Sequence, residues 1–259
     1  MHIPVSSYPM LLQELSTVAR RAGDAILDIY RSDFTSREKN DASPVTEADE
    51  CAEALIVAAL RKLSPAVPVV AEEEVARGSV PKVDGEFWLV DPLDGTREFI
   101  GRNGEFTVNI ALVQAGVPVL GVVFAPALGR LFLGAAGYGA SIDDASGCRA
   151  VRTRAAPAEG LTVVGSRSHG DAQAMDAFLV NRRVASLATA GSSLKFCMVA
   201  CGEADLYPRL GRTMEWDTAA GDAVLRASGG SVRGLDGAML RYGKPGFQNP
   251  HFVACGGGA

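Results

Sequence analysis

Hydrophobic residues recur at helical spacing in two stretches near the start of the chain. Between residues 11 and 30 the apolar positions fall on one face of a helix, and charged residues such as Arg20 and Asp24 lie outside that stripe. A second helical pattern follows residues 43–46 and stops before Pro65. Both patterns predict amphipathic helices.

The pattern then changes to short apolar runs that are typical of strands. These runs cover residues 67–71, 87–91, 106–113, 117–124, 131–133 and 138–142, and most of them are expected to form one sheet. Beyond about residue 145 strands and helices alternate. We expect strands at 161–164, 184–187 and 205–207 and helices near 171–180, 193–201 and 217–227.

No repeat or Pro-rich linker separates the two patterns. The chain therefore belongs to the α/β (α+β) class. We expect two subdomains, residues 1–145 and 146–259, that share an interface and a cleft.

Composition restricts the classes of function. With 47% hydrophobic and 21% charged residues among 259, the chain can bury a sizeable core. A net charge of −5 gives no electrostatic attraction to nucleic acid or to an anionic membrane surface, and nucleic acid is not an expected partner. Any phosphate that the protein binds must be held by local groups.

The cysteines and the chain start bear on location. Five cysteines without regular spacing favour a reducing compartment, and the start lacks a basic segment followed by an apolar one. No apolar stretch reaches the ~18 residues of a membrane span. We expect a cytoplasmic protein, with peripheral attachment at the inner membrane left open, and a monomer or homodimer.

An apolar strand runs directly into two aspartates, Asp91 and Asp94. Pro92 restricts the backbone and Gly95 permits a left-handed turn, so both carboxylates and the Leu93 carbonyl can converge on one point. Oxygen ligands of this kind suit Mg²⁺. The alternative interpretation is an ordinary Asp-Gly turn.

Further acidic residues could reach the same cleft. Glu72 opens a run of three glutamates after another apolar stretch, although such a run also fits a solvated loop. Asp217 follows Trp216 in what we expect to be the first turn of a helix, where capping alone would explain it. Thr46 and Asp49 have the spacing of a capping box.

These four motifs occur in the order typical of one family. The pattern Asp-Pro-hydrophobe-Asp-Gly-Thr, an upstream Glu-Glu and a downstream Trp-Asp resemble the inositol monophosphatase-like phosphatases, from about residue 11 to Val253. Within that family, the chain looks most like the 3′(2′),5′-bisphosphate nucleotidases. Segments 43–46, 88–109, 166–169, 191–197 and 206–209 carry this similarity. The resemblance implies a layered α/β/α/β/α sandwich.

The resemblance also implies roles for individual residues. Glu72, Asp91 and the carbonyl of Leu93 would hold one Mg²⁺, and Asp91, Asp94 and Asp217 a second, with a weaker third ion near Glu72. Asp49 and Thr96 would orient and deprotonate the attacking water. Ala71 stands where relatives usually have Gly or Ser, and Glu72 is taken as the ligand among the three glutamates.

Other residues are expected to bind the substrate. Lys195 and Arg209 suit a second phosphate, because ammonium and guanidinium groups pair strongly with phosphate oxygens. The resemblance places Ser192 with them at a 5′-phosphate and His169 near the nucleoside. The backbone amides of Gly95 and Thr96 are expected to complete the cradle for the reacting phosphate, beside Leu93, Asp94 and Asp217.

Plainer roles exist for some of these residues. His169 could be a surface loop residue, and Lys195 could lie on the solvent face of a helix. Cys197 and Cys201, four apart on one predicted helical face, are expected to pack in a core, as is Trp88.

The implied activity is a Mg²⁺-dependent phosphomonoesterase of sulfur metabolism, inhibited by Li⁺. It would remove the 3′-phosphate of adenosine 3′,5′-bisphosphate and release AMP, with 3′-phosphoadenylyl sulfate as a second candidate substrate. One alternative is an inositol-1-phosphate or fructose-1,6-bisphosphate phosphatase on the same metal site. A second is a catalytically silent nucleotide or metal sensor, which would require the loss of a ligand or of the Asp49–Thr96 pair.

Overall fold

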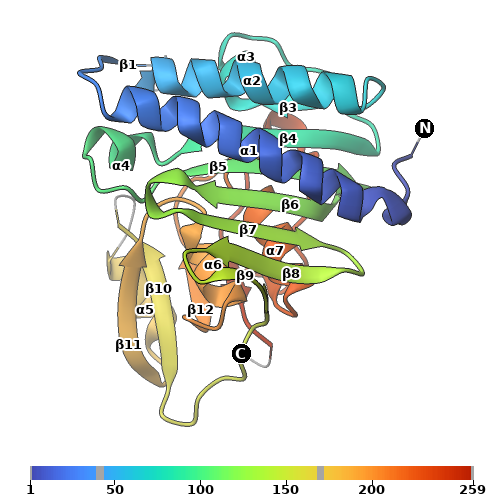
Figure 1. Cartoon of the computed structure of the whole chain (residues 1–259). Helices are drawn as coiled ribbons and strands as arrows, with labels where there is room; N and C mark the ends of the chain where they lie inside the picture. The colour runs from blue at the N-terminus through green and yellow to red at the C-terminus, as the bar shows by residue number, and fades with distance from the viewer. Residues whose placement is uncertain (1, 39–43, 168–171, 258–259) are drawn as a thin grey trace.

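Two β-sheets and three layers of helices alternate through the molecule. The computed structural model describes residues 2–38, 44–167 and 172–257. Helices α1 (Tyr8–Tyr30) and α2 (Glu47–Leu63) lie side by side over one face of the larger sheet, as Figure 1 shows. The predicted α/β/α/β/α layering is confirmed.

The larger sheet has seven strands in sequence order, of which only β3 and β4 run parallel. Its strands are β3 (Val69–Ala71), β4 (Glu86–Asp94), β5 (Thr107–Gln114), β6 (Val117–Ala125), β7 (Arg130–Ala135), β8 (Gly139–Asp144) and β9 (Gly147–Val151). Short connections join β5 through β9 into an antiparallel meander. The predicted single sheet for this part of the chain is therefore correct.

The smaller sheet has the order β11-β10-β12-β14-β13. Its strands are β10 (Leu161–Ser166), β11 (Val184–Ala190), β12 (Leu206–Arg209), β13 (Ser231–Gly234) and β14 (Phe252–Cys255). Strands β10, β11 and β12 are parallel. The connection from β10 to β11 moves one way across the sheet, and the connection from β11 to β12 moves back the other way. Because parallel crossovers are right-handed, α5 (Ala172–Leu179) and α6 (Leu194–Ala200) lie on opposite faces of this sheet.

Both faces of the seven-stranded sheet are covered by other elements. Side chains that alternate across a strand are therefore buried on either face. Trp88 and Val90 of β4 join the core beneath α1 and α2, whereas Phe87 and Leu89 join the core shared with α6 and the smaller sheet. Trp88 is fully buried, as predicted. The strand that ends in the two aspartates is therefore anchored from both sides.

Helix α7 (Ala219–Ala227) comes from the end of the chain but packs on β5, β6 and β7 of the first sheet. Glycines in those strands permit the close approach. A Cβ atom at Gly121 would lie 2.4 Å from the Ala220 carbonyl oxygen, and one at Gly134 would lie 2.6 Å from the Val224 Cα. The middle layer therefore depends on residues from both halves of the sequence.

Several boundaries differ from the sequence expectation. Residues 72–76 form the short helix α3 (Glu72–Ala76) instead of a loop, because the Glu53 carboxylate accepts the backbone N–H groups of Glu73 and Glu74. Strand β9 and the small pair β1 (Ser36–Glu38) and β2 (Pro44–Thr46) have too few residues to show a pattern. Strands β13 and β14 were not predicted either.

The division of the chain near residue 145 remains a prediction. Strand β9, which follows that position, still pairs with β8 in the first sheet. Within the described residues, no helix has both the length and the apolar character needed to cross a membrane.

Candidate active site

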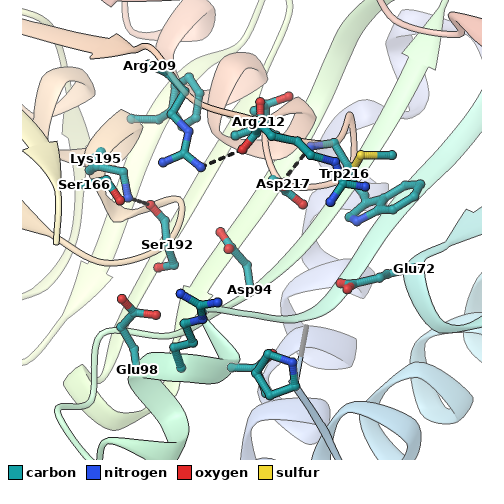
Figure 2. Close-up of a pocket in the computed structure, with 18 of the residues that line it drawn as sticks. Glu72, Asp94, Glu98, Ser166, Ser192, Lys195, Arg209, Arg212, Trp216 and Asp217 are labelled. Carbon is teal, nitrogen blue, oxygen red and sulfur yellow. Dashed lines mark hydrogen bonds between the residues drawn. The ribbon is translucent and has the colours of Figure 1, made fainter. Parts of the chain in front are cut away.

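A cavity of about 610 Å³ opens between the two sheets. Its walls come from the end of β4, the start of α4 (Thr96–Ile100), the start of α3, the end of β12 and the segment 212–218. Figure 2 shows Lys195, Ser192 and Arg209 on one side of the cavity and Glu72 on the other, with Asp94 and Asp217 between them and Glu98 below Ser192. We call Glu72, Asp94 and Asp217 the acidic wall, and Ser192, Lys195 and Arg209 the basic wall.

The predicted turn at the end of β4 is present. The pairing of β4 with β5 shifts register between Asp91 and Asp94, so Pro92 and Leu93 leave the regular ladder. Gly95 adopts φ 94°, which a residue with a side chain rarely adopts, and α4 begins at the next residue. The Asp91 carboxylate accepts the Leu93 N–H at 3.0 Å, which holds the turn from within.

Asp49 belongs to the predicted capping box and also contacts Thr96, which lines the cavity. Its Oδ2 accepts the backbone N–H of Thr46 at 2.8 Å and the Thr46 hydroxyl at 2.7 Å. The Thr96 hydroxyl lies 3.3 Å from Asp49 Oδ1 and 3.3 Å from the Leu93 carbonyl oxygen. The cap therefore holds a buried carboxylate against a hydroxyl that lines the cavity.

The members of the acidic wall come from three separated segments. Glu72 is the first residue of α3, Asp94 is the last residue of β4, and Asp217 precedes α7 (Figure 2). Asp217 is not in the first helical turn as predicted, because α7 begins only at Ala219. Its Oδ2 instead accepts the Met214 N–H at 2.8 Å, which fixes it at the end of the preceding loop.

The acidic wall carries unfavourable charge. The pKa of Asp94 is raised to about 6, mainly by burial and also by the charges of Glu98 and Glu72, against the opposing effect of Lys195. Burial also raises the pKa of Asp217 well above its usual range, and the charges of Asp94 and Glu72 add to this. A divalent cation would relieve both the burial of these charges and their repulsion.

The residues of the acidic wall fit Mg²⁺. No group of three or more His, Cys, Asp or Glu side chains within the described segments is already drawn together tightly enough to ligate an ion. The available donors, however, are carboxylate oxygens and one backbone carbonyl, which hard cations prefer to nitrogen and sulfur ligands. Asp91 is buried directly behind the turn and does not itself line the cavity.

Lys195 lies inside the protein and not on a solvent face. Its side chain is buried on α6, and Nζ donates to the carbonyl oxygens of Ala190 at 3.2 Å and Ser192 at 2.5 Å. The pKa of Lys195 is lowered to about 8, mainly by burial and also by the nearby Arg209, while the charge of Asp94 opposes the change. The ammonium thus orders the turn that carries Ser192.

Two polar atoms of the basic wall are buried without hydrogen-bond partners among the described residues. They are Arg209 Nε and Ser192 Oγ. Arg209 uses another nitrogen, Nη2, to donate to the Arg212 carbonyl at 2.8 Å. Ser192 has a φ of 44°, an uncommon value for a residue with a side chain. Because such atoms are costly to leave unsatisfied, they indicate a bound group with hydrogen-bonding oxygens.

A chain of polar groups that was not predicted from the sequence joins the carboxylate of Asp94 to the backbone of Asp217, within the acidic wall. Asn109 Nδ2 donates to Asp94 Oδ2 at 3.3 Å and to Ser193 Oγ at 3.0 Å. The Ser193 hydroxyl then donates to the Asp217 carbonyl at 2.6 Å, and Thr107 donates to Asn109 Oδ1 at 3.0 Å. Polar residues two apart in an otherwise apolar strand were the available signal.

The remaining predicted residues have simple positions. The Leu93 side chain is in the core, so that residue offers only its backbone to the cavity. Cys197 is buried in the core and Cys201 is half-buried, and neither forms a disulfide. His169 lies outside the described residues.

Comparison with known proteins agrees with this geometry. The profile described as "Inositol monophosphatase family" matches residues 10–254. The chain belongs to the inositol monophosphatase family. The family predicted from the motifs is confirmed.

Curated relatives in this family are similar over nearly their whole length. The chain is 44% identical over 245 residues to the 3′(2′),5′-bisphosphate nucleotidase CysQ of Salmonella typhimurium, covering 93% of this chain and 98% of the relative. It is 45% identical over 247 residues to the protein of the same name from Escherichia coli K12, with the same coverage of both chains.

Solved structures of the family share the fold. CysQ from Bacteroides thetaiotaomicron has a TM-score of 0.81 at 36% identity, covering 95% of this chain and 97% of that one. The inositol monophosphatase from Anabaena has a TM-score of 0.76 at 26% identity, covering 97% and 92%. The family is generally Mg²⁺-dependent, in agreement with the donors of the acidic wall, and small phosphate compounds are its substrates.

Proposed function

We propose that this chain hydrolyses the 3′-phosphate of adenosine 3′,5′-bisphosphate to give AMP and phosphate. The decisive observation is one cavity with two chemically distinct walls, because a bisphosphate presents one phosphate to each. The acidic wall suits the reacting phosphate with its cations, and the basic wall offers a guanidinium and a hydroxyl with unused hydrogen-bonding capacity. The curated relatives named 3′(2′),5′-bisphosphate nucleotidase support this assignment. 3′-Phosphoadenylyl sulfate is the second candidate substrate.

The acidic wall is proposed to hold two Mg²⁺ ions. Glu72, Asp91 and the Leu93 carbonyl would bind one, and Asp91, Asp94 and Asp217 the other, with a weaker third ion beside Glu72. When bound, the ions neutralise the phosphate, lower the pKa of a bound water and stabilise the leaving oxygen. The Asp91 carboxylate accepts the Leu93 N–H at one oxygen, and a carboxylate can keep such a bond while it ligates an ion.

Asp49 and Thr96 are proposed to handle the proton of the attacking water. The Thr96 hydroxyl already donates toward Asp49 Oδ1, so Thr96 Oγ can accept a proton from water while its own proton moves to the carboxylate. The capping bonds from Thr46 hold that carboxylate in place. The backbone N–H groups of Gly95 and Thr96 would donate to the reacting phosphate at the start of α4.

The basic wall is proposed to bind the 5′-phosphate. Arg209 Nε and Ser192 Oγ would donate to its oxygens, and Lys195 would contribute charge from behind the Ser192 turn. His169 remains a proposed contact of the nucleoside.

Parallel assays of phosphate release test this function. The substrates are adenosine 3′,5′-bisphosphate, inositol 1-phosphate and fructose 1,6-bisphosphate, each with Mg²⁺ and with or without Li⁺, and the Asp94→Asn variant is the blank. We expect a strong preference for the nucleotide and loss of that preference in Arg209→Gln. A preference for inositol phosphate or fructose bisphosphate would reject the substrate assignment. No release from any substrate would favour the silent sensor.

We also propose a cytoplasmic location and a monomeric or homodimeric state. All five cysteines are free thiols, which supports a reducing compartment. Sedimentation analysis of the purified chain measures the oligomeric state directly.

A further inference from the structure

Glu105 connects segments that carry opposite walls of the cavity. It lies between α4 and β5, shortly after the Asp94 turn. Its carboxylate accepts Arg167 Nε at 2.7 Å and Nη2 at 2.8 Å. The same carboxylate accepts the backbone N–H of Gly191 at 2.8 Å. We call Glu105, Arg167 and Gly191 the clasp.

The clasp is in close contact with the turn that bears Ser192. A Cβ atom at Gly191 would lie 2.5 Å from the Glu105 carbonyl oxygen and 2.8 Å from Glu98 Cγ, so no side chain fits there without movement. On the other side of the turn, Lys195 binds the carbonyls of Ala190 and Ser192. Glu105 and Lys195 therefore hold the turn between them.

The clasp also joins the ends of two strands in the smaller sheet. Arg167 follows β10, and its Nη2 donates to the Thr189 carbonyl of β11 at 3.3 Å. The backbone N–H of Arg167 donates to the Ala190 carbonyl at 3.3 Å. Glu105 thus fixes the end of β11 relative to the loop that follows the Asp94 turn of the first sheet.

Stability alone is a weak explanation for this arrangement. The Arg167 side chain is 43% exposed and that of Glu105 is 22% exposed, and ion pairs with such exposure add little to the free energy of folding. The positive φ of Ser192, however, needs surroundings that hold the backbone in place. The Arg167 guanidinium lowers the pKa of Glu105, so its carboxylate remains charged.

We propose that Glu105, acting through Arg167 and Gly191, is a positioning residue that sets the separation between the acidic and basic walls. It thereby determines the preference for substrates with two phosphates over substrates with one. This inference rests on the proposed function, because it concerns how the second phosphate is selected.

A matched control is available on the β8–β9 hairpin. Asp144 accepts Arg149 Nη1 at 2.7 Å and Nη2 at 2.9 Å, and it also accepts the Ser146 backbone N–H at 2.9 Å. The Asp144→Ala variant therefore removes the same kind of contact set from a part of the chain that does not line the cavity.

The test compares Glu105→Ala with Asp144→Ala on adenosine 3′,5′-bisphosphate and adenosine 3′-monophosphate. We expect Glu105→Ala to raise KM for the bisphosphate about tenfold, the cost of a lost charged hydrogen bond, with kcat changed less than about twofold. The monophosphate should be hydrolysed equally well by both variants. Glu105→Gln, which keeps an acceptor for Gly191, should recover part of the loss.

A second measurement needs no metal. Calorimetry in EDTA follows binding of AMP, which carries the 5′-phosphate, and we expect about tenfold weaker binding in Glu105→Ala and none of this loss in Asp144→Ala. Equal losses on both substrates, or an unchanged affinity for AMP, would overturn the role of the clasp. A wild-type protein with no preference for the bisphosphate would overturn the proposed function and the clasp together, whereas preference kept in Glu105→Ala would overturn the clasp alone.

Discussion

Asp217 and Asp222 lie close together in sequence, the first just before α7 and the second within it, yet the surroundings of their charges differ. Asp222 is fully buried, and it accepts Arg226 Nε at 2.6 Å, Arg226 Nη2 at 3.0 Å and the Tyr242 hydroxyl at 3.0 Å. Asp217 is half-buried at the cavity and forms no ion pair with a described residue; its partner is the Met214 N–H. Asp94 likewise forms no ion pair within the described chain, although Lys195 influences its pKa.

Other buried carboxylates resemble Asp222. Glu215, fully buried, accepts the backbone N–H groups of Gly243 at 2.6 Å and Lys244 at 2.9 Å, and the Lys244 ammonium lies 2.6 Å away. Asp205 is paired with Arg154. The comparison shows that the chain supplies its own cation where a carboxylate holds the fold together. At Asp94 and Asp217 we propose that a bound cation supplies this compensation.

The largest effect is expected at Asp94. Asp94→Asn should lower turnover of adenosine 3′,5′-bisphosphate at least about a thousandfold, because a ligand of the proposed ions is lost. The metal-free protein should unfold at the same temperature or a higher one, since the substitution removes repulsion from Glu72 and Asp217. Phosphate release and thermal unfolding in EDTA measure the two effects. Lower metal-free stability with retained turnover would contradict the comparison.

Asp222→Asn should have the opposite effect. It leaves the Arg226 guanidinium without its charged partner and should lower the free energy of unfolding by about 3 kcal/mol. The folded fraction should keep its activity because Asp222 does not line the cavity. Urea unfolding of Asp222→Asn beside Asp217→Asn measures the difference, and equal destabilisation by both substitutions would reject it.

Added Mg²⁺ should distinguish the two kinds of carboxylate. At about a hundredfold excess over Kd, a ligand that binds only the native state raises the free energy of unfolding by about 2.7 kcal/mol. We expect that increment in the wild type and in Asp222→Asn, and little of it in Asp94→Asn. Urea unfolding with Mg²⁺ or EDTA measures it. An increment of equal size in all three proteins would place the ions elsewhere.

Asn109 should affect metal affinity without being a ligand. Asn109→Ala removes the bridge between the Asp94 carboxylate and the Ser193 hydroxyl, and outer-shell losses of this kind weaken metal binding about tenfold. Calorimetric titration with Mg²⁺ measures this without turnover. Thr17→Ala is the control because the exposed Thr17 hydroxyl donates to the Gln13 carbonyl within α1, away from the cavity. An unchanged affinity in Asn109→Ala would reject the bridge.

The smallest effect concerns acid stability. Arg154 and the Thr162 N–H lower the pKa of Asp205 below its ordinary value of 3.8, whereas burial raises that of Asp222. The folded protein binds a proton at Asp205 less readily than the unfolded chain does, so this contribution to stability is present above pH 3.8 and is lost as pH falls through the folded pKa. Asp205→Asn should therefore flatten the acid limb of stability against pH. Urea unfolding from pH 5 to about 3 measures the slope, and an unchanged slope would contradict this assignment.

The longer elements and the turn at Asp94 could be predicted from the sequence, whereas several short elements could not. Helices α1 and α2 show many periods of apolar spacing, whereas β13 and β14 have four residues each and are stabilised by pairing with one another and with β12. The Asp94 turn was predictable because the turn needs a left-handed backbone at residue 95, and glycine is the residue that adopts it readily. The helix at residues 72–76 was not, because Glu53 from another helix caps it.

The sequence by itself determined the family, the α/β layering, the carboxylates of the acidic wall and the candidate residues of the basic wall. These features depend on residue types at fixed spacing, and local backbone chemistry ties such spacing to a conformation. Only the tertiary structure decided that Lys195 is buried, that Asn109 bridges Asp94 to Ser193, and that Glu105 holds the Ser192 turn. These contacts join residues far apart in the chain, so they form only when both sheets pack around α6 and α7. The spacing of residues along the sequence therefore does not predict them.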